Sequence, residues 1–80
     1  MKNLALTMTE YLVDYKENID IKITEGVETV VIEVTVDQRD LGKIIGKHGR
    51  TADALRLILN CAGAKMKKRA ILQILDMERD

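Results

Sequence analysis

Residues 41–51 of the chain read Leu-Gly-Lys-Ile-Ile-Gly-Lys-His-Gly-Arg-Thr, and this segment is the most informative part of the sequence. Its glycines Gly46 and Gly49 predict a sharp turn, because glycine has no Cβ to obstruct the backbone or an approaching phosphate. Apolar residues on both sides fit one helix before the turn and one after it. Amides at the start of the second helix would face the turn and carry positive partial charge. The stretch therefore predicts an anion-binding loop between two helices.

The flanks of this loop set the expected bounds of the two helices. Asp37 is a good N-cap, and Asp40 falls in the first turn, where the helix dipole favours negative charge. We therefore expect a first helix over residues 38–45. A second helix should span residues 50–62 and end at Gly63 in a left-handed cap.

Hydrophobic periodicity predicts the remaining elements. Helical spacing of apolar side chains predicts an amphipathic helix over residues 3–17, with its stripe formed by Leu4, Met8, Tyr11, Leu12 and Tyr15. Alternation predicts two strands that form a hairpin around a turn at Glu25-Gly26, with inward residues Ile19, Ile21, Ile23, Val30, Ile32, Val34 and Val36. A third strand is expected over residues 66–75, with Ala70, Leu72 and Ile74 on one side. This order predicts an α+β domain with helices on one face of a three-stranded sheet.

Charge is distributed unevenly along a chain whose formal net charge is zero. Residues 1–40 hold four basic and nine acidic side chains, whereas residues 41–80 hold nine basic and four acidic ones. Local potential governs attraction to phosphate, so the second half can form an anion-attracting surface. A solvated charged face remains the alternative from charge alone.

Eighty residues allow one domain, over residues 1–80. A lone cysteine, no signal peptide and no stretch long enough for a membrane span lead us to expect a cytoplasmic protein without a membrane partner.

Other glycine-rich motifs fit the loop less well. Three residues separate Gly42 from Gly46, where a Walker A loop needs four, and His48 stands where that motif has a hydroxyl. A dinucleotide fingerprint would follow a strand, and here the loop follows a helix. The sequence holds no metal-ligand cluster, triad or paired carboxylates, so we expect neither an enzyme nor a cofactor or metal site.

Residues 41–51 resemble the signature of the KH RNA-binding domain, and the predicted element order matches its type II arrangement. The continuation from Arg50 to Lys65 is similar to the small bacterial single-KH proteins of the KhpA family, and the similarity covers nearly the whole chain. The resemblance implies a type II KH fold and a cytoplasmic RNA-binding protein with broad sequence selectivity, acting as an RNA chaperone or post-transcriptional regulator. It also implies pairing, either as a homodimer or as a heterodimer with a larger protein that carries Jag and KH domains. One departure is the exit of the first helix, which lacks the proline often found there.

On this interpretation the loop clamps the backbone of about four nucleotides of single-stranded RNA, and the bases lie in an adjacent groove. The expected RNA-binding residues are Lys43, Ile44, Ile45, Gly46, Lys47, His48, Gly49, Arg50 and Thr51. Groove walls are expected from Leu41, Ile44, Ile45, Ala52 and the second strand around Ile32 and Val34. The alternative is that the glycines only end helices and the basic side chains are ordinary surface.

The helix expected over residues 50–62 carries two apolar stripes. One stripe can face the sheet and consists of Ala52, Leu55, Leu59 and Ala62. The other is turned away from it and consists of Ala54, Leu57, Ile58 and Cys61. Either the N-terminal helix covers this second stripe, or it is a subunit interface, and we favour a homodimer through Leu57, Ile58 and Cys61. A protein-assembly subunit whose RNA contact is secondary is therefore the alternative function.

Overall fold

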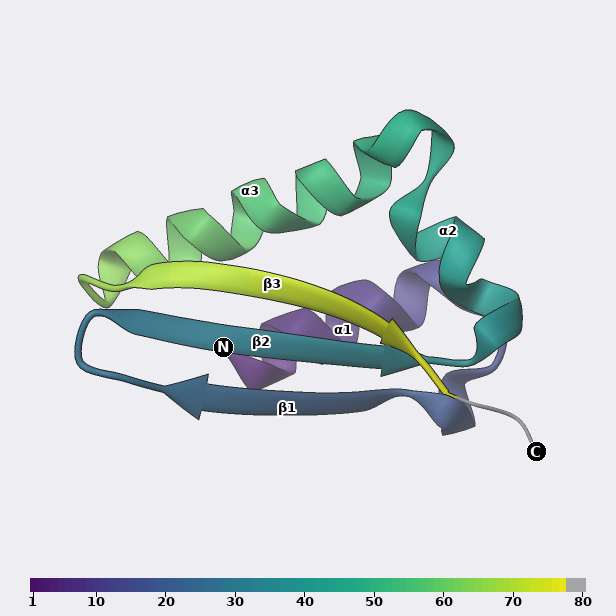
Figure 1. The fold of residues 1–80 in the computed structure, drawn as a ribbon, viewed down its shortest axis with the longest axis horizontal. Helices are drawn as coiled ribbons and strands as arrows, with labels where there is room; N and C mark the ends of the chain where they lie inside the picture. The colour runs from purple at the N-terminus through teal and green to yellow at the C-terminus, as the bar shows by residue number, and fades with distance from the viewer. Residues whose placement is uncertain (78–80) are drawn as a thin grey trace.

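A three-stranded sheet with helices against one face forms the protein (Figure 1); the structure is a computed structural model and describes residues 1–77. The elements in chain order are α1 (Lys2–Leu12), β1 (Asp20–Glu25), β2 (Thr29–Val36), α2 (Leu41–Ile45), α3 (Arg50–Lys65) and β3 (Arg69–Asp76). Short 3-10 turns lie at Lys16–Asn18, Gln38–Asp40 and Lys47–Gly49. The central strand β2 pairs antiparallel with β1 and parallel with β3. This mixed sheet and element order confirm the predicted α+β, type II KH fold.

The inner face of β2 forms the centre of the core. Its alternate residues are at most 3% exposed, and they are Val30, Ile32, Val34 and Val36. These β-branched side chains suit a strand that is paired on both edges and covered by helices. Ile32 and Val34 therefore cannot wall a surface groove, and the prediction that they do was wrong.

The first helix is shorter than predicted and packs through a different face. It ends at Leu12 instead of residue 17. Leu4 and Tyr11, expected on the buried stripe, are 37% and 88% exposed. The buried face is centred on the small residues Ala5 and Thr9, where the Thr9 hydroxyl donates a 2.7 Å hydrogen bond to the Ala5 carbonyl. Small side chains let the helix lie close to the sheet, and this outweighs the larger apolar stripe.

A buried carboxylate links the segment just after α1 to the start of α2. Asp40 is 0% exposed, and its oxygens accept hydrogen bonds from the amides of Asp14 (3.1 Å) and Tyr15 (2.9 Å). We expected Asp40 to face the helix dipole, but it turns inward and terminates α1 instead. Asp37 is the N-cap that the sequence predicts, because its carboxylate accepts from the Arg39 amide at 2.9 Å.

Gly63 lies inside α3 and not at a cap, so that prediction was wrong. The helix continues to Lys65, and Lys67 takes the left-handed conformation with φ 58°. A Cβ on Gly63 would lie 2.9 Å from the Lys68 carbonyl oxygen and 3.1 Å from the Ala70 Cβ. Gly63 therefore lets α3 touch the start of β3. Gly26, in the hairpin turn, is not among the positive-φ residues.

The close contact at Gly63 predicts that alanine substitutions at Gly63 and at Gly42 change stability in opposite directions. We expect Gly63→Ala to lower the free energy of unfolding by about 1–2 kcal/mol, because the added methyl group meets a backbone oxygen. Gly42→Ala should raise it by about 0.5 kcal/mol, because Gly42 is helical and a Cβ added there would have no atom within 4 Å. Urea denaturation of the two variants measures both values. Equal effects would contradict this account of Gly63.

Candidate nucleic-acid interface

The predicted loop is present and joins α2 directly to α3. Gly46 has φ 73° and ψ 175°, and Gly49 has φ 74° and ψ 9°, so both use backbone conformations that favour glycine. His48, at the tip between them, is also left-handed with φ 58°. A Cβ on Gly46 would lie 2.2 Å from the Thr51 hydroxyl oxygen, whereas one on Gly49 would meet open space. Thr51 thus packs under Gly46 and makes glycine necessary there on steric grounds as well.

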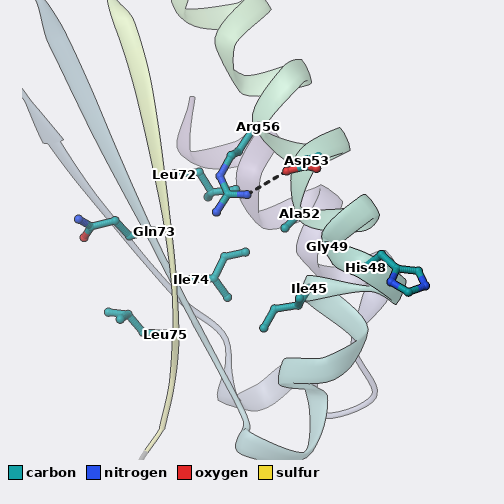
Figure 2. Close-up of a pocket in the computed structure, with 10 residues that line it drawn as sticks. All are labelled: Ile45, His48, Gly49, Ala52, Asp53, Arg56, Leu72, Gln73, Ile74 and Leu75. Carbon is teal, nitrogen blue, oxygen red and sulfur yellow. Dashed lines mark hydrogen bonds and ion pairs between the residues drawn. The ribbon is translucent and has the colours of Figure 1, made fainter.

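A groove of about 670 Å³ opens beside this loop (Figure 2). One wall comes from the loop and the start of α3, and it consists of Ile45, His48, Gly49, Ala52, Asp53 and Arg56. The other wall comes from β3 and consists of Leu72, Gln73, Ile74 and Leu75. Figure 2 shows Ile45 and Ile74 extending toward one another from opposite walls, while the His48 ring points outward from the loop. The groove thus combines aliphatic side chains from both walls with the polar side chains of His48, Asp53, Arg56 and Gln73.

The strand that borders the groove differs from our prediction. We expected β2, but β2 is the central strand and β3 is the edge strand beside the loop. Ile44, expected among the RNA contacts, is 0% exposed, so its side chain holds α2 in the core and offers no surface to a ligand. Leu41 is partly buried against the same core and does not line the groove. The alternating pattern of β3 indicated a strand, but it gave no strand order and therefore no position beside the loop.

Three exposed basic side chains gather at the loop: Lys47, His48 and Arg50. Within residues 1–77 none of them forms an ion pair. The charges of Lys47 and Arg50 are therefore available to an anion placed at the start of α3, where the helix amides add positive partial charge.

Lys43 differs from these three because its ammonium group is already engaged. It pairs with the Asp14 carboxylate and lies 3.6 Å from the buried Asp40 carboxylate. The hydrogen bond to Asp14 makes the largest contribution to raising the pKa of Lys43. Lys43 thus joins α2 to the exit of α1.

The second apolar stripe of α3 is exposed. Leu57 is 66% exposed and Ile58 is 46% exposed, and Ala54 and Cys61 are exposed beside them. The alternative that α1 covers this stripe was therefore wrong. Exposed neighbouring apolar side chains on one helix face are typical of an interaction surface.

Comparison with known proteins gives consistent matches over nearly the whole chain. The family model described as KhpA/KhpB, KH domain matches residues 2–74. The RNA-binding protein KhpA of Aquifex aeolicus is 46% identical over 76 residues, which cover 95% of this chain and 96% of that protein. The RNA-binding protein KhpA of Caldanaerobacter subterraneus is 37% identical over 75 residues, which cover 94% of this chain and 100% of that protein. No solved structure matches the chain significantly. Among residues 1–77, no helix has the length and apolar character needed to cross a membrane.

Proposed function

Because this chain belongs to the KhpA/KhpB family of KH domains, we propose that it binds single-stranded RNA at the Gly46–Gly49 loop and in the groove beside β3. The relatives it matches are named RNA-binding proteins, and the family is not one of enzymes. The observation that carries the proposal is the position of the loop: Ile45, His48 and Gly49 line the groove, and the exposed cations Lys47 and Arg50 adjoin them in the chain.

Each part of this site has a chemical use in holding a strand. The basic side chains and the first amides of α3 face the sugar-phosphate backbone, where charge and hydrogen-bond donors position the strand. Bases enter the groove between Ile45 and Ala52 on one wall and Ile74 on the other. Within residues 1–77, β3 pairs only with β2, so its second edge leaves backbone donors and acceptors for base edges. Binding is reversible and involves no chemical step.

Broad base selectivity follows from the apolar groove. The chain has no Phe or Trp, and its two tyrosines do not line the groove. Tyr11 lies on α1, and the Tyr15 ring is covered by the Arg39 guanidinium at 3.3 Å from its centroid. Aliphatic walls accept any base face, so selectivity must come from a few edge contacts. A cytoplasmic RNA chaperone or post-transcriptional regulator is the cellular role that fits such binding.

NMR titration with a four-nucleotide RNA tests the location of the site. We expect amide shifts over residues 45–53 and 72–75, because these segments form the loop and the two groove walls. The amides of β1, at the opposite edge of the sheet, should stay unchanged and serve as the internal control. Shifts confined to α1 and β1 would place the RNA elsewhere and contradict the proposal.

A second function is favoured by the exposed stripe of α3. We propose that Ala54, Leu57, Ile58 and Cys61 form a homodimer interface, since pairing would remove their apolar surface from water. A heterodimer with a larger protein that carries Jag and KH domains would use the same stripe. On this alternative the protein is an assembly subunit and its RNA contact is secondary.

Replacing Leu57 and Ile58 with aspartate should convert the dimer to a monomer, because the charges would be buried against the partner. Leu57 is 66% and Ile58 46% exposed in the single chain, so the variant monomer should lose only a small part of its packing and stay folded. Sedimentation equilibrium at high micromolar concentration measures the change. Tyr11→Asp, which alters an 88% exposed residue on α1, is the control and should remain dimeric. A wild-type protein that is monomeric at this concentration would contradict the homodimer.

A further inference from the structure

An ion pair lies in the α3 wall of the groove. Arg56 donates a hydrogen bond from Nη1 to Oδ1 of Asp53 at 3.3 Å, and both residues line the groove (Figure 2). They are three residues apart on α3, so they share one side of the helix. Asp53 is the only acidic residue among residues 41–69, a segment with eight basic ones. A carboxylate therefore lines a site whose other charges attract phosphate.

The stability of the fold does not explain why this pair lies in the groove. The side chain of Arg56 is 47% exposed and that of Asp53 is 74% exposed, and ion pairs so accessible to water contribute little to stability. Asp53 is in the first turn of α3, where negative charge suits the helix dipole, but a carboxylate on any side of that turn would serve equally. A carboxylate also repels phosphate, so its place in this wall fits contact with the uncharged bases of the strand.

Most of the hydrogen-bonding capacity of the pair is unused. A guanidinium group has five N–H donors, and a carboxylate has two acceptor oxygens. Within residues 1–77, the side chains of Arg56 and Asp53 form only the one hydrogen bond that joins them. The second carboxylate oxygen, Oδ2, and the remaining guanidinium donors are thus available to a ligand in the groove. The pair offers such a ligand an acceptor beside several donors.

The pair lies beyond the aliphatic part of the groove. Arg56 is six residues after Arg50, the first residue of α3, and therefore about 9 Å farther along the helix axis. Figure 2 shows Arg56 extending from α3 toward β3, past Ala52 and Ile74 and at the end of the groove away from Ile45. A base that packs on these aliphatic side chains can direct its polar edge to the pair.

We infer that Asp53 and Arg56 select cytosine over uracil at this base position. The inference rests on the proposed function, because it names the base that the groove prefers. Cytosine presents its N4 amino group as a donor to Asp53, and its N3 and O2 accept from Arg56. Uracil has the acceptor O4 in place of N4, so that oxygen would face the carboxylate, and its N3–H would face a donor. The two pyrimidines have similar sizes, so the aliphatic walls accept both.

The test measures the ratio of two affinities, for tetramers of cytidine and of uridine, by fluorescence anisotropy. We expect the wild-type protein to bind the cytidine tetramer about fivefold more tightly, a modest preference because water competes for both exposed side chains. In Asp53→Asn the preference should fall below about twofold, because an amide can turn either its oxygen or its N–H toward the base. Arg56→Gln should weaken binding of cytidine about threefold more than binding of uridine, since only cytosine has an acceptor at N3.

A control and the wild-type protein separate this inference from the proposed function. Asp20→Asn removes the same charge from an exposed position on β1, the strand farthest from the groove, and should keep the wild-type ratio. Equal affinity of the wild type for both tetramers would overturn the inference, as would a wild-type ratio in Asp53→Asn. An equal loss on both tetramers in Arg56→Gln would assign Arg56 to phosphate and overturn it too. A wild type that binds neither tetramer would instead overturn the proposed function.

Discussion

The variant Lys47→Asp with His48→Asp is expected to lose single-stranded RNA binding while keeping the wild-type fold. Both side chains are exposed and form no ion pair within residues 1–77, so the fold does not depend on them. Aspartate is tolerated in the left-handed conformation of His48, and both glycines remain. The change introduces two negative charges where the proposed site holds phosphates, and we expect affinity to fall by about 100-fold or more at low salt. Anisotropy with a short oligouridine measures the loss, and circular dichroism verifies the fold.

A control with the same change in net charge shows whether the effect is local. Lys22→Asp with Lys2→Gln also lowers the formal charge by three, with neutral histidine as the reference. Lys22 is exposed on β1, the strand farthest from the groove, and Lys2 begins α1. This control should bind RNA with an affinity within about threefold of wild type, since it leaves the loop intact. A folded loop variant that binds RNA as tightly as the control would disprove the role of the loop.

Asp40→Ala is expected to have the largest effect on stability. It removes a fully buried carboxylate and leaves the amides of Asp14 and Tyr15 without their acceptor. Losing the partner of buried polar groups costs about 3 kcal/mol in total. A chain of this size has roughly 4–12 kcal/mol of stability, so a large part of it would be lost. Urea denaturation at pH 7 measures the change, and Asp14→Ala, which truncates a 71% exposed side chain, is the control.

The stability that the Asp40 carboxylate contributes should depend on pH. Burial raises the pKa of Asp40, but the Tyr15 and Asp14 amides and the charge of Lys43 together bring it below its ordinary value. The pKa of Asp37 is lowered as well, chiefly by hydrogen bonds from the Arg39 side chain and amide. A folded pKa below the unfolded one gives stability that is present above about pH 4 and is lost as the pH falls further. The difference between wild type and Asp40→Ala should therefore shrink below about pH 4, and a constant difference would contradict this role of Asp40.

Local patterns in the sequence were enough to predict the elements, because each depends on its own neighbours. The alternation of β2 and the two glycines of the loop specified a buried strand and a turn, and the structure has both. The errors concern choices that depend on distant residues. The buried face of α1 is centred on Ala5 and Thr9 and not on Leu4, because small side chains let the helix pack close to the sheet. The spacing of apolar residues along one helix gives no information about how closely that helix approaches the sheet.

The candidate site also combines features that follow from residues close in sequence with features that depend on distant residues. The loop and its cations follow from residues close together in sequence. The β3 wall requires the strand order, and the link from Asp40 to the exit of α1 joins residues 25 and 26 positions apart. Gly63 shows the difficulty most clearly, because a glycine near a helix end fits a cap as well as a close contact. Only the position of Ala70 across from it decides between the two.

The contact at Gly63 also acts as a pivot for α3. Packing fixes this end of the helix against β3, while the loop end stands about 20 Å away along the helix axis. A rotation of α3 by about 3° around Gly63 would displace the loop end by about 1 Å and leave Gly63 almost in place, because displacement grows with distance from the pivot. The side chains of Ala52 and Leu55 are buried in the core near the loop end, so core packing has to absorb any such displacement and keeps changes in the width of the groove's mouth small.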